Sequence, residues 1–178
     1  MTRAYYVAPL PPLHIISGAA FNTFTTYQSI SPAPGIKIPA NFLEPGTTLT
    51  LKARGHASNT ATPTLLMGFF YGTAASVPFG QSGAITTTTA MAAWPWSLDY
   101  DARVRSVGTA GSMYGQGILR LPTSITAFTL SAIPITQALR TTAIDTTIEK
   151  VIGVGAAWSA SSASNTITCE HFSVEVIS

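Results

Sequence analysis

The sequence predicts an all-β fold, and three observations support this prediction. Apolar and polar residues alternate over several stretches of the chain, and a period of two is typical of strands. Thr, Val, Ile and aromatic residues, which favour strands over helices, fill these stretches. Gly and Pro, with 14 and 12 copies, punctuate the chain between them. Only residues 137–142 are compatible with a helix, and with no more than one turn of it.

The clearest strand begins at Trp94-Pro95. From Trp96 every second residue is apolar, and the positions between carry two carboxylates and then two guanidiniums. We expect the charges to neutralise one another within this face or across to a neighbouring strand. Four glycines follow and predict a wide turn, then a second strand that approaches closely. The apolar set is Trp96, Leu98, Tyr100, Ala102 and Val104; the charged set is Asp99, Asp101, Arg103 and Arg105; the glycines are Gly108, Gly111, Gly115 and Gly117.

The other elements repeat this alternation in weaker form. Residues 64–71 are continuously apolar, which predicts a central strand buried on both faces. Glu44-Pro45-Gly46 is a strong turn signal, and Pro122 and Pro134 are expected to bound strands. In chain order we expect strands at 20–30, 36–43, 47–54, 64–71, 84–90, 94–105, 118–121, 125–133, 144–158 and 166–177, with loops at 55–60 and 159–165. The stretch at 144–158 is either one long strand or a bulged pair of strands.

About eight to ten strands exceed an immunoglobulin-type sandwich and fit a two-sheet β-sandwich of jelly-roll type. No linker divides the 178 residues, which suit a single domain. Residues 1–18 are rich in proline and apolar side chains, so we expect an extended N-terminal arm there and the β-sandwich over 19–178. Prolines also break the run that a signal peptide would need.

The composition is poor in charge. Charged residues make up 9% of the chain, against about 25% in ordinary soluble domains. Such a surface is either dominated by small polar residues or covered by other subunits. A net charge of +2 with scattered Lys and Arg argues against nucleic-acid binding. The longest apolar run, 65–71, is too short to cross a membrane.

Catalytic and metal-binding patterns are not found. Asp99 and Asp101 form the one plausible carboxylate pair, but arginines follow in the same row, so a charge-balanced strand explains them better. The three histidines (His14, His56 and His171) have no metal-ligand spacing. Asp145-Thr146-Thr147 is read as a turn rather than part of a calcium site. Cys169 alternates with apolar neighbours and is expected in the core. We therefore predict no enzyme activity, no cofactor and no metal.

A sugar-binding platform is the remaining chemical option. Trp94, Trp96 and Tyr100 are aromatic, but the last two share the parity of the apolar face and are expected in the core. This leaves Trp94 as the candidate glycan contact.

Several stretches resemble small virion structural proteins of tailed bacteriophages, and the similarity covers most of the chain beyond the arm. They are PANFLEPGTTLTLKARG at 39–55, RSVGTAG at 105–111 with GQG at 115–117, and Trp158-Ser159 with SNTIT at 164–168. Such proteins are often jelly-roll or sandwich proteins that decorate the head or form minor tail components. The resemblance implies a non-enzymatic protein, commonly a homotrimer, that is made in the host bacterial cytoplasm and binds the major capsid protein on the virion surface.

Three hypotheses follow. The first is a capsid decoration (cement) protein that stabilises the outer head shell, the second a minor tail or tail-tip protein. The third is a carbohydrate-binding module for attachment to a host surface, with Trp94 as its contact. For partner binding we choose Tyr5, Tyr6, Leu10 and Leu13 in the arm, with Arg103 and Arg105 on the charged strand.

Overall fold

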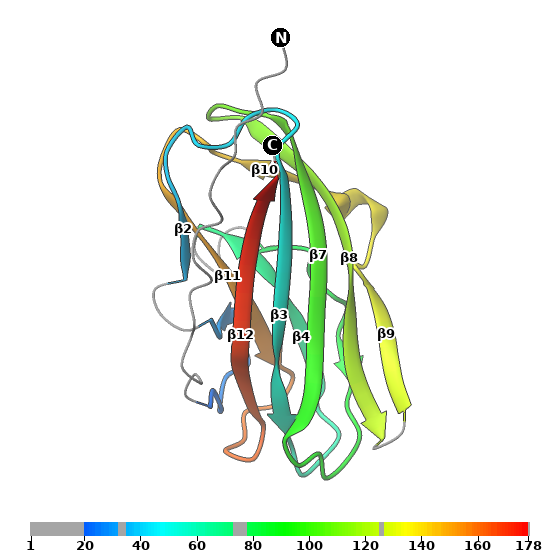
Figure 1. The fold of residues 1–178 in the computed structure, drawn as a ribbon. Coiled ribbons are helices and arrows are strands. Elements are labelled where there is room, and N and C mark those ends of the chain that lie inside the picture. The colour runs from blue at the N-terminus through cyan, green and yellow to red at the C-terminus, as the bar shows by residue number, and fades with distance from the viewer. Residues whose placement is uncertain (1–19, 32–34, 73–77, 125–126, 178) are drawn as a thin grey trace.

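Two antiparallel sheets packed against each other make up the computed structural model, which describes residues 20–31, 35–72, 78–124 and 127–177 (Figure 1). Sheet 1 contains β1 (Gln28–Ser29), β2 (Ile36–Ile38), β4 (Thr64–Tyr71), β5 (Pro78–Phe79), β6 (Ile85–Thr86) and β11 (Lys150–Trp158). Sheet 2 contains β3 (Thr48–Ser58), β7 (Trp94–Ser106), β8 (Gly111–Ser124), β9 (Ala127–Ile133), β10 (Thr141–Ile144) and β12 (Thr166–Ile177).

The strand order differs strongly between the sheets. Sheet 2 runs β10-β8-β7-β3-β12, with β9 also pairing β8, and it holds most of the long strands. Sheet 1 runs β1-β11-β4-β5, with β2 on β11 and β6 on β4. The predicted all-β, two-sheet sandwich is confirmed, whereas the jelly-roll topology stays a prediction. A 3₁₀ turn, Gln137–Arg140, precedes β10, where the sequence allowed one helical turn.

The alternation of β7 gives the sandwich its core. All five residues of the predicted apolar set are at most 2% exposed. Tyr100 lies at the centre, with its ring centroid 6.0 Å from that of Phe69 and 5.5 Å from that of Phe79. Phe172 of β12 stacks on Phe69 at 6.0 Å. Aromatic side chains from both sheets therefore interlock, which is the packing that a sandwich requires.

Two predicted strands match the structure to the residue, β4 and β12. The prediction of burial on both faces of β4 is confirmed for residues 67–71, which are consecutively buried. The glycines after β7 also behave as expected. Gly117 lies against the β7 backbone, where a Cβ would come within 2.0 Å of the Asp99 carbonyl oxygen.

The predicted loop at 55–60 is wrong, because β3 continues to Ser58. Gly55 is a packing residue: a Cβ there would meet the Trp96 ring at 2.7 Å. Opposite Gly55, the register of β12 shifts between Cys169 and His171. Glycine is common in loops, so the sequence around Gly55 predicted a loop, but here the glycine lies opposite a bulge within a continuous strand.

Other boundaries are also corrected. The strand expected at 20–30 is reduced to β1 and one isolated bridge from Phe21 to Ile167. The stretch at 84–90 provides only β6. Pro122 lies inside β8 rather than at its end, because the ladder to β7 stops at Arg120 and the ladder to β9 shifts register after Pro122. A proline is tolerated at such a bulge.

Candidate functional site

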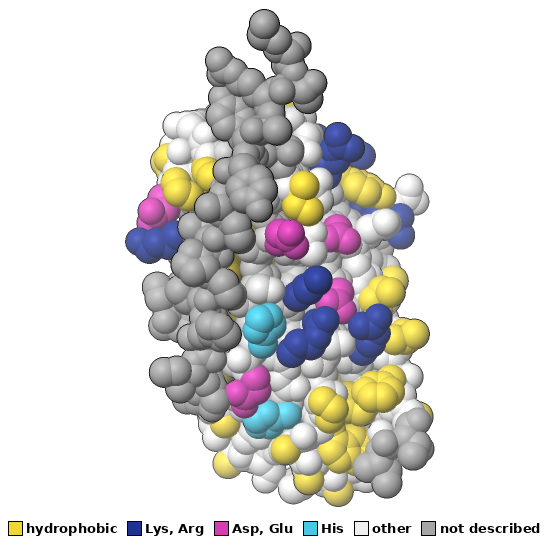
Figure 2. Space-filling view, in the orientation of Figure 1, with side chains coloured by type: hydrophobic (Ala, Val, Ile, Leu, Met, Phe, Trp, Pro, Cys, Tyr) yellow, Lys and Arg dark blue, Asp and Glu magenta, His cyan; other side chains and the backbone are white. Residues whose placement is uncertain are grey.

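The outer face of sheet 2 carries three groups of side chains that are candidates for binding. Figure 2 shows basic, acidic and histidine side chains crossing this face, with hydrophobic side chains gathered towards its right-hand and lower margins. The first group, the polar band, is Thr50, Arg54, His56, Asp99, Asp101, Arg120 and Glu170. The second, the basic hollow, is Pro45, Gly46, Arg103, Val104, Arg105 and Tyr114. The third, the apolar edge, is Ile118, Phe128, Leu130 and Ala132.

Asp99 organises the polar band from the middle of β7. Its Oδ1 accepts from Arg54 Nη2 of β3 at 2.6 Å, and its Oδ2 accepts from Arg120 Nη1 of β8 at 3.0 Å. Arg54 Nη1 also donates to the carbonyl oxygens of Ala53 and Leu98 at 2.8 and 3.2 Å. The predicted neutralisation across to neighbouring strands is confirmed for Asp99, but it is wrong for Arg103 and Arg105, which form no ion pair within the described ranges.

The other carboxylates of the band have separate partners. Asp101 Oδ1 accepts from the Thr50 hydroxyl at 2.7 Å. Glu170 Oε1 lies 3.2 Å from His56 Nδ1. Because each carboxylate has its own partners, Asp99 and Asp101 act in the structure as ties between strands.

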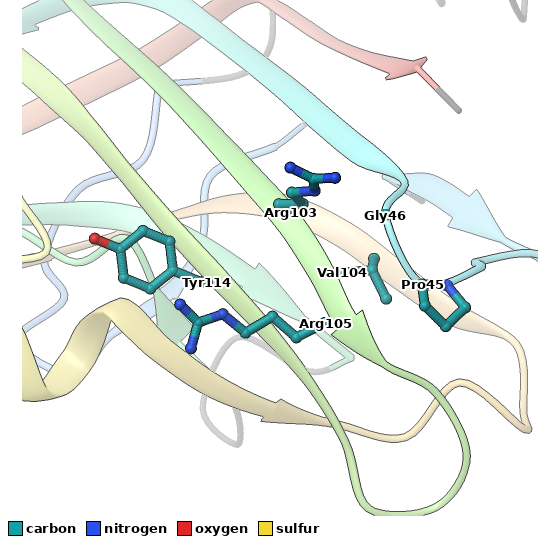
Figure 3. A pocket seen from close by; sticks show the side chains of 6 residues that line it. All are labelled: Pro45, Gly46, Arg103, Val104, Arg105 and Tyr114. Atoms are coloured by element: carbon teal, nitrogen blue, oxygen red, sulfur yellow. The ribbon is translucent and has the colours of Figure 1, made fainter.

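The basic hollow contains both arginines that the sequence singled out for partner binding (Figure 3). The Arg105 guanidinium lies 4.6 Å from the centroid of the Tyr114 ring, which is a cation–π contact. The register between β7 and β8 shifts from Val104 to Ser106, so Arg105 has no partner residue on β8. The glycine of the predicted turn, Gly46 with φ +98°, borders the Arg103 side.

Arg103 and Arg105 are both exposed, and within the described ranges neither makes an ion pair or a hydrogen bond. The hollow therefore presents two uncompensated positive charges on one strand. Guanidinium groups in this state bind carboxylates or other oxyanions.

The apolar edge is the group that sequence reasoning missed. Phe128 and Leu130 of β9 are 57% and 65% exposed, and Ile118 of β8 is 41% exposed. The register pairs Ile118 with Ala132 and Arg120 with Leu130, which places these side chains on one face. The signal in the sequence was the alternation of Phe128, Leu130 and Ala132 against Thr129 and Ser131. An apolar-inward rule assigns the larger residues to the core, but Leu119 and Leu121 of β8 fill the core and are opposite Ser131 and Thr129.

The predicted glycan contact and the predicted contacts in the N-terminal arm are the remaining candidates from the sequence. Trp94 is half-buried and packs against the core cluster, so the expectation that it is free of the core is wrong. Glycan binding through its exposed part stays a prediction. The arm residues Tyr5, Tyr6, Leu10 and Leu13 lie outside the described residues.

Two further predictions about single residues are confirmed. Cys169 is fully buried, and burial raises the pKa of its thiol to about 12. Asp145 closes a turn, since its Oδ1 accepts from the Thr147 amide at 2.9 Å and the Thr147 hydroxyl at 2.6 Å. These hydrogen bonds hold the pKa of the Asp145 carboxyl below its usual value.

Over the part of the chain that the structure describes, no three His, Cys, Asp or Glu side chains come together as a metal site would require. The described residues likewise include no helix with the length and apolar character needed to cross a membrane. No protein-family model, curated protein or solved structure matches the chain.

Proposed function

We propose that this chain is a structural protein that works by surface contact, as a decoration (cement) protein on the outer head shell of a tailed bacteriophage. The observation that carries the proposal is the apolar edge. Phe128 and Leu130 stand more than half exposed on a strand without charges, in a chain with only 9% charged residues. The largest exposed apolar patch of a protein is often a functional surface, and this supports contact with another protein here.

The basic hollow supports the same proposal. Arg103 and Arg105 keep their charges uncompensated on β7 of sheet 2. In the proposed function they receive acidic side chains of the major capsid protein. Such rim charges orient a partner and speed its association, while apolar contacts supply most of the affinity.

The N-terminal arm gives the proposal a second attachment. Residues 1–18 contain the apolar side chains expected to contact the shell, and an extended segment of this length reaches up to roughly 55 Å. Two linked contacts bind more tightly than either alone. The resemblance implies a homotrimer, which sedimentation of the full chain distinguishes from other assembly states.

The copy number of the chain in purified virions tests the proposal. Quantitative mass spectrometry against the major shell protein is expected to give a number comparable to that protein. A handful of copies per particle would instead favour the minor tail protein. Absence from the particle would overturn the virion assignment and favour a carbohydrate-binding module, which a glycan panel would then examine.

A further inference from the structure

We infer that the apolar edge joins two copies of this chain, through antiparallel pairing of β9 with β9 of a second copy. This inference concerns the free protein; the proposed function assigns the same surface to the shell contact, so the shell has to displace the second copy there. It starts from the position of β9 in sheet 2. Within the described ranges β9 pairs with β8 and with no other strand, and Figure 1 shows it at the margin of the sandwich.

An edge strand of this kind presents unpaired backbone N–H and C=O groups to any other strand. Proteins usually protect such edges with lysines, prolines or inward-pointing charges. The stretch Ala127–Ile133 contains none of these, since it reads AFTLSAI. Its seven residues match the length of an ordinary strand. The β9 edge is therefore competent for strand pairing as it stands.

A second copy fits the apolar edge because antiparallel pairing of two β9 strands places apolar side chains opposite apolar side chains. When two β9 strands pair antiparallel over their full length, Leu130 is at the centre and meets Leu130 of the second copy. Phe128 then meets Ala132 of the second copy on the same face. Every exposed apolar residue of one β9 is thus opposite an apolar residue of the other, and two large aromatics are never forced together.

The charges near this edge also permit self-association. Arg120 is the charged residue in register with Leu130, and its guanidinium is already held by Asp99 at 3.0 Å. The net charge of one chain is only +2. Two copies therefore approach without strong repulsion, whereas a partner strand with charged side chains would leave those charges against Phe128 and Leu130.

The exposed apolar side chains alone provide less area than a standard dimer interface. At about 200 Å² for a large apolar side chain, Phe128, Leu130 and Ile118 together leave roughly 300 Å² exposed on each copy. A standard interface buries about 800 Å² on each partner. The paired backbone and the flanking parts of β8 and β9 have to provide the rest, so we expect micromolar rather than nanomolar affinity.

Sedimentation of the full chain at about 50 µM, where a dimer of micromolar affinity is mostly assembled, tests this inference. The wild type is expected at twice the 18.6 kDa of one chain. Leu130→Lys is expected to sediment as a monomer, because two like charges would meet at the centre. Ile148→Lys is the matched control: its side chain is 50% exposed and lies away from β9, so this variant should remain a dimer.

A mixture of Leu130→Lys and Leu130→Glu chains should form the dimer again, because opposite charges would then meet at the centre of the pair.

Disulfide cross-linking tests the register without adding charge. Across an antiparallel pair the two Cα atoms of residue 130 lie about 4.5–5.5 Å apart, within the range of a disulfide. Leu130→Cys should therefore cross-link under mild oxidation. Phe128→Cys should not, because the two copies of residue 128 are about 13 Å apart along the strands. Native Cys169 is fully buried and does not compete.

The inference would be overturned by a wild-type monomer, by a trimer, or by a dimer that persists in Leu130→Lys. Cross-linking through Phe128→Cys instead of Leu130→Cys would overturn the proposed register. Each of these results leaves the copy number in virions unaffected, so the two proposals can fail separately.

Discussion

Tyr100 shows how single positions determine the packing between the sheets. Its ring fills space that two glycines leave open, since a Cβ at Gly80 would lie 2.7 Å from the ring and one at Gly115 would lie 2.4 Å from the hydroxyl oxygen. The sequence predicted both the inward tyrosine and the close approach of the second strand. It did not predict Gly80, because contact between distant segments leaves no local pattern.

Substitution of Gly117 by Ala is expected to destabilise the protein by about 2–3 kcal/mol. The new methyl group would collide with the β7 backbone, at 2.0 Å from the Asp99 oxygen, and a backbone inside a sheet has little room to move. Urea unfolding measures the change. Gln116→Ala is the matched control, because Gln116 is exposed on the same strand, and its effect should stay within about 0.5 kcal/mol. Equal effects at the two positions would contradict this account.

At the scale of elements, β7 and β9 show what alternation predicts and what it leaves open. Alternation gave the two faces of β7 correctly, because one face is apolar and the other is charged. In β9 it separates Phe128 and Leu130 from Thr129 and Ser131, but it does not say which of the two sets faces the core. The orientation of a short edge strand follows from its neighbour β8, whose Leu119 and Leu121 already occupy the core.

Asp99 is expected to contribute to the cohesion of three strands. Asp99→Ala removes the acceptor of both Arg54 and Arg120 at partly exposed positions, so we expect a loss of about 1 kcal/mol. Urea unfolding at low and high salt measures it, and the loss should shrink as salt screens the charges.

The control for Asp99 is Glu149→Ala. It breaks the more exposed pair of Glu149 with Lys37, whose side chains are more than half exposed, and should cost less than about 0.5 kcal/mol. If both variants lose the same stability, the bridging position of Asp99 has no special effect.

At the scale of the whole molecule, the two-sheet sandwich was predictable because it follows from strand count and alternation. The order of strands within each sheet was not, because it depends on which distant segments meet. The candidate sites were likewise predictable only where they depend on neighbouring residues in the sequence. Arg103 and Arg105 were chosen from the sequence, whereas their hollow also needs Pro45 and Gly46 from another part of the chain.

The free energy of unfolding is expected to fall as pH rises from about 9 towards 12. Burial raises the pKa of Cys169 from 9.0 to about 12, and burial with the nearby Asp145 charge raises that of Tyr71 from 10.0 to about 12. Over this range the unfolded chain releases protons that the folded chain retains, which favours unfolding. Urea unfolding between pH 8 and about 10.5 measures the slope. Cys169→Ala should flatten it between about pH 9 and 10, and an unchanged slope would show that Cys169 does not contribute.

The pairing of β12 with β3 has a mechanical consequence. The register joins β12 to all 11 residues of β3, from Ser58 opposite Thr166 to Thr48 opposite Ile177. A force pulling Ile177 along the strand axis loads these backbone hydrogen bonds together in shear. A force at right angles to the sheet would open them one after another from the end. Sheet 2 is therefore stiff in tension along its strands and weak to peeling from the β12 side.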